Sequence, residues 1–186
     1  MNTKRYLRVA AFVAVLVLLV ASIGNAFADS GSATYDYLIG TGILCGLDPT
    51  ACPAIAMADN GDTIEITGAG TLSIHPKSAT GGGAFVHKDA AGNVLGGGTW
   101  AAQKLLSFIG YGCGGPGLPD DFCGGRATLQ VHLVATSGLE SNGILQVDCL
   151  IGSFPAGAVE GIRLVIQALD FNFNKEISGL TLFIQQ

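Results

Sequence analysis

The sequence predicts an all-β protein built as an antiparallel meander of about eight strands. From Thr34 onward, apolar and polar residues alternate in many short runs, and no segment keeps a sustained helical period. The 28 glycines follow no collagen-like repeat, so they indicate turns, bulges and close backbone contacts. Because the expected strands are long and contain glycines, a β-barrel is favoured over a sandwich.

Residues 1–28 have the pattern of a secretory signal peptide. Lys4, Arg5 and Arg8 precede an apolar run of roughly 15 residues, and Ala26 and Ala28 form an A-x-A cleavage site. An uncleaved membrane anchor is the alternative, but a spanning helix needs about 20 apolar residues. We therefore expect a signal-peptide helix that is cleaved after Ala28. This leaves a single secreted or extracytoplasmic β-domain at residues 29–186, without stable membrane insertion.

The charge of this domain argues against nucleic acid as a partner. Removing residues 1–28 takes away three of the nine basic residues and none of the fourteen acidic ones, which changes the net charge from −5 to −8. The few remaining basic residues form no stripe that could neutralise phosphates. An acidic protein is also repelled by anionic membrane surfaces.

The first expected hairpin joins "AIAMAD" to "DTIEITGAGTLSIH" through Asn60-Gly61, a dipeptide that favours a tight turn with positive φ. In the second strand, alternation separates an apolar inward face from a polar outward face. Gly68 and Gly70 occupy inward positions, where glycine indicates bending or close packing. The apolar inward residues are Ile64, Ile66, Leu72 and Ile74.

Two glycine triplets lie in the next expected hairpin, "GGGAFVHKDAAGNVLGGGTW", whose tip is at residues 90–93. A Walker loop would need Lys-Ser or Lys-Thr before a helix, and a dinucleotide fingerprint would need G-x-G-x-x-G leading into a helix. Neither occurs, so phosphate binding is disfavoured. We expect the triplets to lie in the strands, where glycine permits strong coiling or bulging of the sheet.

Four further strands are expected in the second half of the chain. "GRATLQVHLVAT" and "GILQVDCLIG" alternate clearly, with Leu129, Val131 and Leu133 inward in the first of them. "GIRLVIQALDF" and "ISGLTLFIQQ" follow, and the polar turn "NFNKE" joins them. The longest connection is expected at residues 110–125, because this segment is rich in turn residues.

Five cysteines lie in the exported domain, where an oxidising environment favours disulfides. "CGLDPTAC" and "CGGPGLPDDFC" are short, turn-rich segments bounded by cysteines. We expect local bridges between Cys45 and Cys52 and between Cys113 and Cys123. Cys149 lies in an alternating apolar strand, so it is expected to be a free, buried thiol. Neither spacing is C-x-x-C, which disfavours a zinc site.

The three histidines are the first candidates for a metal site, because three imidazoles on adjacent strands can bind zinc and leave a water position open. His75 and His132 are expected to face away from the apolar side. The direction of His87 stays open, because Phe85 shares its face. Three separate, solvated histidines are the simpler interpretation, so no metal site is predicted.

No nucleophile or carboxylate arrangement predicts catalysis. The sequence contains no G-x-S-x-G elbow. Glu65 and Asp148 would form a carboxylate pair only if their strands were neighbours, and we interpret both as solvated strand residues. Turn chemistry explains the remaining acidic clusters, which lack the spacing of a calcium loop. These clusters contain Asp59, Asn60, Asp62, Asp120 and Asp121.

Two segments carry a resemblance to known proteins. "ADNGDTIEITGAGTLSIHPKSATGGGAFVHKD" and "GILQVDCLIG" resemble segments of uncharacterised secreted microbial proteins, a group without an assigned activity. The strand count and the use of glycine also resemble small secreted barrels of the allene oxide cyclase and dirigent kind. This likeness of architecture implies a barrel and carries no catalytic residue over to this chain.

The sequence therefore predicts no catalytic residue, cofactor or metal. We expect a secreted non-catalytic barrel that binds a small apolar ligand or another macromolecule, since a barrel of about eight strands can hold one small ligand. Two alternatives stay open. One is an isomerase or cyclase that shapes an apolar substrate inside the barrel. The other is a structural or surface-association module with a filled interior.

Overall fold

The structure of this protein is a computed structural model that describes residues 32–167 and 171–186. The expected signal peptide at residues 1–28 lies outside the described residues. Within the described part of the chain, no helix is long and apolar enough to cross a membrane.

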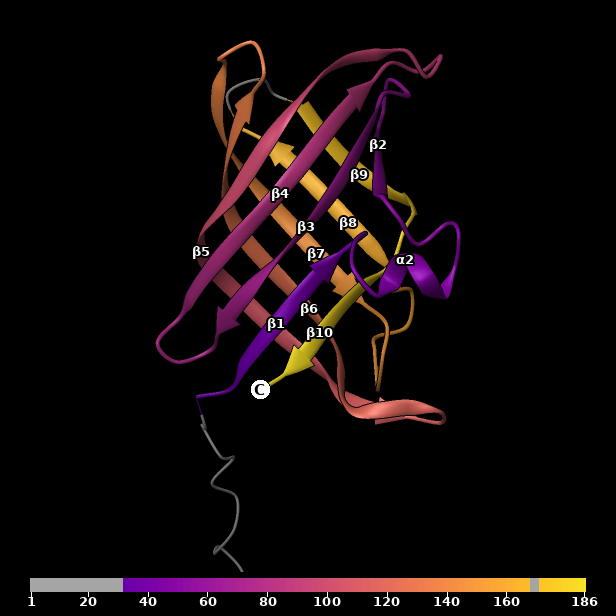
Figure 1. The fold of residues 1–186 in the computed structure, drawn as a ribbon, viewed down its shortest axis with the longest axis vertical. Coiled ribbons are helices and arrows are strands. Elements are labelled where there is room, and N and C mark those ends of the chain that lie inside the picture. Colours follow the sequence, from indigo (N-terminus) through magenta and orange to yellow (C-terminus); the bar gives the residue numbers. More distant parts are fainter. Residues whose placement is uncertain (1–31, 168–170) are drawn as a thin grey trace, which may run out of the picture. The chain divides into compact units, whose positions relative to one another are not determined.

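The described residues form one antiparallel sheet of ten strands, which confirms the expected all-β class (Figure 1). A single helical turn, α2 (Leu44–Leu47), lies between β1 and β2. The strands are β1 (Thr34–Ile39), β2 (Ala54–Ala58), β3 (Thr63–Ser73), β4 (Ser78–Lys88), β5 (Val94–Gly115), β6 (Leu118–Ala135), β7 (Glu140–Cys149), β8 (Gly161–Ile166), β9 (Phe171–Ser178) and β10 (Thr181–Gln185).

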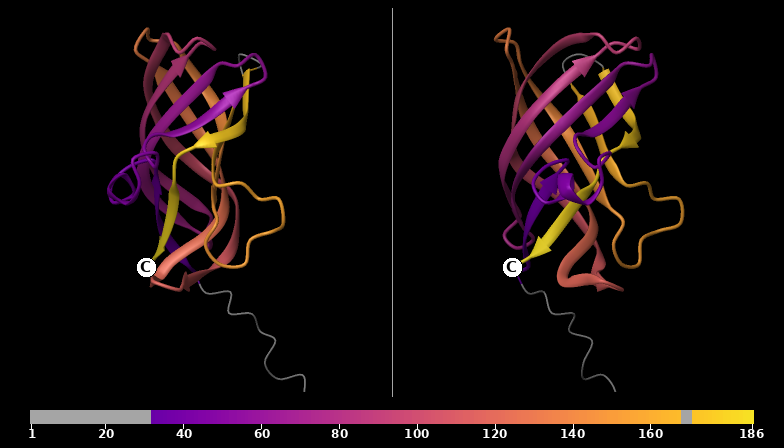
Figure 2. Two further views of the ribbon diagram at one scale, coloured as in Figure 1. Left: turned by 90° about the vertical axis from the view of Figure 1, so that its right-hand side faces the viewer. Right: turned by 45° about the vertical axis from the view of Figure 1, so that its right-hand side comes forward.

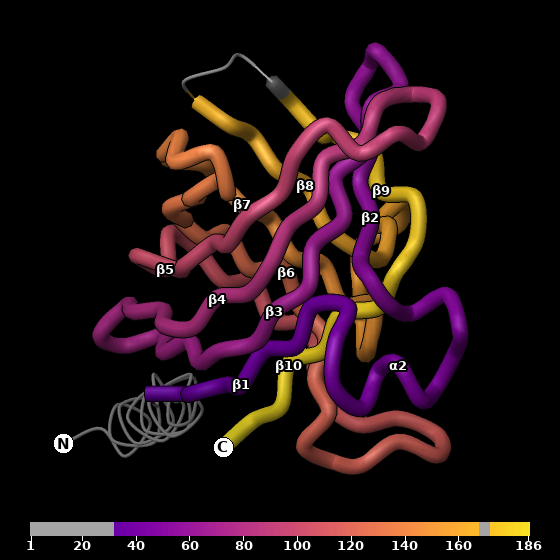
Figure 3. Tube along the Cα trace, turned by 45° about the horizontal axis from the view of Figure 1, so that its top comes forward, coloured from indigo at the N-terminus to yellow at the C-terminus, as the bar shows by residue number. Residues whose placement is uncertain are grey.

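The strand pairings close into a ring, because two circuits of hydrogen-bonded neighbours share β3, β4, β5 and β6. In the first circuit the strands from β2 to β9 pair in consecutive order, and β9 pairs back with β2. In the second circuit β6 pairs with β10, β10 with β1, and β1 with β3. Figure 3 shows β3, β4 and β5 in front of β6, β7 and β8, so that the sheet surrounds an interior.

The ring has two different ends, because β3 pairs with different strands along its length. Residues 63–66 of β3 pair with β2, and residues 68–73 pair with β1. We call these the β2/β9 end and the β1/β10 end. Figure 1 shows β1, β10 and the C-terminus together at one of them.

The strand count differs from the expected number of about eight because β1 and β9 are additional. The polar segment "NFNKE", expected as a turn, lies inside β9. There β9 pairs with β8 on one side and with β2 on the other, and Phe173 is buried. Pairing on both sides therefore makes a strand of a segment whose polar composition indicates a turn.

The connection expected at residues 110–125 is also different. β5 and β6 continue to pair through most of this segment, with Gly110 opposite Gly125 and Cys113 opposite Cys123. The strands end only at Gly115 and Leu118. Backbone pairing and a cross-strand disulfide hold this part of the hairpin, so it needs no apolar alternation.

Aromatic side chains fill the inside of the ring towards the β1/β10 end. The rings of Tyr37 and Trp100 are stacked with their centroids 6.5 Å apart, and Phe108 meets Phe183 edge-on at 5.1 Å. Trp100 donates its indole N–H to the carbonyl oxygen of Thr67 at 3.0 Å. Large aromatic side chains therefore fill this part of the interior that the strands enclose.

The inward glycines make room for these rings. A Cβ added to Gly68 would lie 2.4 Å from Cζ2 of Trp100. One added to Gly70 would lie 2.0 Å from the backbone carbonyl oxygen of Thr80 and 2.5 Å from the hydroxyl oxygen of Tyr37. Gly83, from the first triplet, pairs with both Gly68 and Trp100. Both triplets lie in strands, as expected. A Cβ added to Gly83 would lie 1.9 Å from the carbonyl oxygen of Thr67, so close backbone approach excludes a side chain at this position.

Glu160 links the end of β7 to the start of β10, two strands that do not pair with each other. Its carboxylate accepts the backbone N–H of Leu150 at 2.7 Å and both the backbone N–H and the hydroxyl of Thr181 at 2.8 Å. Glu160 belongs to the segment 150–160, which Figure 2 shows looping out beside the β5–β6 hairpin. Burial raises the pKa of this carboxyl group above its ordinary value. A side chain thus replaces missing sheet hydrogen bonds.

Candidate functional site

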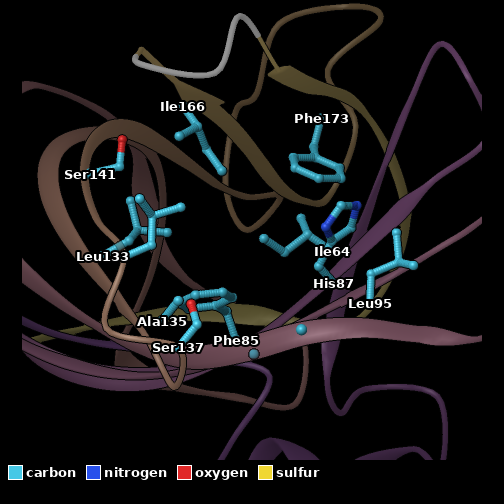
Figure 4. A pocket seen from close by; sticks show the side chains of 13 residues that line it. Ile64, Phe85, His87, Leu95, Leu133, Ala135, Ser137, Ser141, Ile166 and Phe173 are labelled. Atoms are coloured by element: carbon cyan, nitrogen blue, oxygen red, sulfur yellow. The ribbon is translucent and has the colours of Figure 1, made fainter.

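A cavity of about 230 Å³ opens at the β2/β9 end of the ring (Figure 4). We call this cavity the cup. Every strand from β3 to β9 contributes to its wall, together with the turn between β6 and β7. The lining residues are Ile64, Phe85, His87, Leu95, Gly96, Gly97, Leu133, Ala135, Ser137, Leu139, Ser141, Ile166 and Phe173.

The register of the sheet explains why residues from distant parts of the chain meet in the cup. His87 pairs with Ile64 on one side and with Gly96 on the other. Directly opposed residues in a sheet project to the same face. Leu133 and Ser141 form another such pair on the far wall. One inward layer of side chains therefore surrounds the cavity.

The wall of the cup is predominantly apolar. Ile64, Leu133 and Phe173 are almost completely buried, and Phe85 is partly buried. Leu95 and Leu139 lie at the mouth and are 57% and 58% exposed. An apolar wall that continues into an exposed apolar rim is suited to an apolar ligand, because binding removes apolar surface of both the ligand and the rim from water.

Gly96 leaves one side of the cup open. A Cβ added at this position would meet no atom within 4 Å, in contrast to the crowded positions of the inner glycines. The backbone of Gly96 has no positive φ. A larger side chain is therefore sterically permitted here and would occupy space in the cup.

His87 is the ionisable side chain among the residues that line the cup. Its Nε2 lies 3.2 Å from a carboxylate oxygen of Asp62, and its ring meets Phe173 edge-on with centroids 5.5 Å apart. The side chains of His87 and Asp62 are 27% and 14% exposed. Asp62 directly follows the turn at Asn60, whose side-chain oxygen accepts the Asp62 backbone N–H at 3.1 Å. A hairpin turn thus places the carboxylate that orients the imidazole.

The structure does not bring the three histidines together. His75 is exposed in the turn between β3 and β4, at the other end of β4 from His87. His132 lies on the outer face of β6 beside Asn142 and Glu140, at 3.1 Å and 3.2 Å. Among the described residues, no group of three metal-binding side chains is close enough to hold an ion.

Sequence reasoning left the direction of His87 open, and the structure places it inward. The signal for this was present, because residues two apart in a strand share a face and Phe85 is apolar. Asp62 gave no comparable signal. Its contact with His87 depends on the antiparallel pairing of β3 with β4, which the sequence does not state.

The two strand carboxylates considered as a pair lie apart, on β3 and β7. Glu65 forms an ion pair with Lys88 at 2.5 Å. Asp148, expected to be solvated, is completely buried instead. Its carboxylate accepts hydrogen bonds from Nε of Arg126 on β6 and from Nε2 of Gln146 on β7, both at 2.6 Å. These side chains cover the carboxylate and satisfy it, which explains why it is not solvated.

The acidic clusters near the turns have structural contacts. Asn60 accepts the backbone N–H of Asp62 within its turn, as described above. Asp89, which lies outside those clusters, similarly accepts backbone N–H groups of Ala91 and Asn93 in the tip of the β4–β5 hairpin. This hairpin tip coincides with the expected one. These contacts are typical of turn chemistry.

The cysteines form the pairs expected from the sequence. Disulfides join Cys45 to Cys52 and Cys113 to Cys123, and Cys149 is a buried free thiol. Burial raises the pKa of the Cys149 thiol to about 12, so it is a poor nucleophile. Two disulfides indicate an oxidising, extracytoplasmic environment.

Comparisons of this chain with protein-family models, with curated proteins and with solved structures find no significant match.

Proposed function

We propose that this chain is a secreted, non-catalytic β-barrel protein that binds a small apolar ligand in the cup. The observation that carries the proposal is the apolar cavity of about 230 Å³ that opens at one end of the ring. The closed circuits of strand pairing support a barrel, since a barrel of about eight strands is just wide enough to be filled or to hold one small ligand.

The volume of the cup limits the size of its ligand. An apolar cavity of about 150 Å³ is large enough to bind benzene. The cup is somewhat larger, so it suits one ring with a short substituent, or an aliphatic molecule of similar size. The aromatic residues that fill the rest of the interior support a shallow site at the end of the barrel and not a through-channel.

The proposal is tested by filling the cup through Gly96→Leu. The added side chain has room at this position and would take the place of a ligand. Gly46→Leu is the matched control, because Gly46 lies in α2 and an added Cβ there also meets no atom within 4 Å. Wild type titrated with p-xylene should show NMR shifts at cup residues, and the Gly96 variant should bind about tenfold more weakly or worse.

Native mass spectrometry of the protein from the organism that makes it is the complementary measurement. Wild type and Gly46→Leu should retain a small molecule that Gly96→Leu lacks. The proposal fails if neither p-xylene nor 4-methylphenol shifts resonances of the cup and no small molecule is retained. That outcome would favour a structural or surface-association module.

A second candidate function, an isomerase-like enzyme, is favoured by the contact between His87 and Asp62 on the cup wall. A carboxylate that orients an imidazole is a common arrangement for a general base. The test is exchange of the α-protons of phenylacetone in D₂O, followed by proton NMR. His87 would take a proton from the carbon beside the carbonyl, the N–H formed on the ring would exchange with D₂O, and the ring would return a deuteron to the same carbon. Catalysed exchange that His87→Gln abolishes would support this function, and exchange at the buffer rate would refute it.

A further inference from the structure

Resting on the proposed binding function, we propose that the ligand of the cup is a neutral molecule with one aromatic ring and one hydroxyl group, and that His87 recognises the hydroxyl. The proposal combines the volume of the cup, the aromatic side chains of its wall and the charge beside His87.

The shape and composition of the wall favour an aromatic ring. Phe85 and Phe173 line the cup, and the imidazole of His87 meets Phe173 edge-on at 5.5 Å. Aromatic rings prefer offset or edge-on neighbours at such distances, and each contact adds to the free energy of apolar burial. Beside them, Gly96 and Gly97 present backbone without side chains, which leaves space for a flat group.

The polar side chains of the lining residues favour a single hydrogen-bonding substituent. Ser137 and Ser141 lie towards the mouth, where Ser137 is exposed and Ser141 partly exposed. The ring of His87 packs on Phe173, which is buried, so His87 lies deeper in the cup than the two serines. Its side chain is still 27% exposed and is therefore accessible to a ligand. The Asp62 carboxylate only accepts hydrogen bonds, so the Nε2 of His87 that faces it carries a proton. A ligand hydroxyl, which can both donate and accept, suits the other ring nitrogen.

The charge next to His87 excludes an anionic substituent. Asp62 lies 3.2 Å from the imidazole, and its side chain is only 14% exposed. A carboxylate on the ligand would approach this negative charge within an apolar cavity, where water screens poorly. The net charge of −8 for residues 29–186 acts in the same direction. The cup should therefore prefer a phenol or benzyl alcohol to the corresponding acid.

Three probes of similar size test the proposal, each titrated into the protein and followed by NMR. They are 4-methylphenol, p-xylene, which replaces the hydroxyl by a methyl group, and 4-methylbenzoate, which replaces it by a charged group. Wild type should bind 4-methylphenol about tenfold more tightly than p-xylene. It should bind 4-methylbenzoate least.

Two variants assign this selectivity to named groups. His87→Phe keeps an aromatic ring on the wall and should bind both neutral probes equally, whereas the control His132→Phe, on the outer face, should keep the wild-type preference. Asp62→Asn removes the charge and retains hydrogen bonding, so its affinity for 4-methylbenzoate should rise about tenfold. Circular dichroism establishes whether each variant is folded, and Asp62→Asn tests the proposal even where His87→Phe does not fold.

The outcomes separate the two proposals. If p-xylene and 4-methylphenol bind wild type with equal affinity, the cup binds apolar ligands but this inference is wrong. A preference for the phenol that persists in His87→Phe, or a benzoate that binds as tightly as the phenol, also overturns it. If no probe binds and native mass spectrometry finds no retained small molecule, the proposed function itself fails.

Discussion

Arg126 and Asp148 form an ion pair whose members differ in exposure, and this difference predicts unequal effects of removing them. The side chain of Asp148 is 1% exposed, whereas that of Arg126 is 33% exposed. Arg126→Met leaves a buried carboxylate without its cation, and breaking a buried pair in this way costs about 3–5 kcal/mol. Gln146 and Tyr111 still donate to this carboxylate, so we expect a loss of about 3 kcal/mol in the free energy of unfolding.

The reverse variant, Asp148→Asn, should cost less. Arg126 keeps its access to water, and the oxygen of the new amide can still accept its Nε–H. A hydrogen bond between two charged groups becomes one with a single charged partner, and Gln146 can turn its amide so that its oxygen accepts from the new NH₂ group. The expected loss is about 1–2 kcal/mol. The free energies of unfolding of the two variants should therefore differ by about 1–2 kcal/mol.

Urea unfolding at neutral pH, followed by the fluorescence of Trp100, the single tryptophan, measures both free energies. Lys88 and Glu65 provide a matched control, because their side chains are similarly exposed at 29% and 21%. Lys88→Met and Glu65→Gln should each cost less than about 1 kcal/mol and show no asymmetry. If Asp148→Asn destabilises the protein as much as Arg126→Met does, burial does not control the pair and the reasoning is refuted.

Three further measurements test other buried groups. Burial raises the pKa of Cys149 from 9.0 to about 12. The folded state thus favours the neutral thiol, so Cys149 should contribute a fall of about 4 kcal/mol in the free energy of unfolding between these pH values. Buried tyrosines such as Tyr37 add to the alkaline loss, which should be smaller by the Cys149 contribution in Cys149→Ala. Burial also raises the pKa of Glu160 above 4.5, so the folded protein binds more protons and its stability should decrease as pH rises above that value. An unchanged pH slope in Glu160→Gln would contradict this assignment. In Gly68→Ala the new Cβ would lie 2.4 Å from Trp100, which should cost about 1–3 kcal/mol in urea unfolding and alter the Trp100 emission spectrum. The new Cβ would also lie 2.7 Å from the carbonyl oxygen of Gly82, so wild-type stability and emission would show that both the indole and this backbone can move aside.

Most of the strands and the local crosslinks are predictable from neighbouring residues. Alternation over β3, β6 and β7 reflects one buried face, which is a property of a few consecutive residues. The turn at Asn60-Gly61 follows from the positive φ of Gly61, which is 89°. The bridge between Cys45 and Cys52 spans seven positions, so the short loop brings its ends together without help from the fold.

Two segments escaped this reasoning because their conformation depends on partners far away in the chain. β9 contains few apolar residues and is a strand because β2 and β8 pair with its backbone on both sides. The distal part of the β5–β6 hairpin is glycine-rich and turn-like in composition, yet it is held by backbone pairing and a disulfide. Every residue type can accept a backbone hydrogen bond, and every type except proline can donate one. Amino-acid composition therefore does not reveal which segments pair in a sheet.

The sequence by itself determined the all-β class, most of the strands and hairpins, and the cysteine pairs, because each depends on residues close together along the chain. Only the tertiary structure decided that Asp148 is buried, that His87 faces the interior beside Asp62, and that seven strands share a cup. Alternation separates the two faces of a strand, but it does not say which strand lies alongside or what covers a face. Register and closure of the ring settle both, and they arise from contacts between residues that are distant in the sequence.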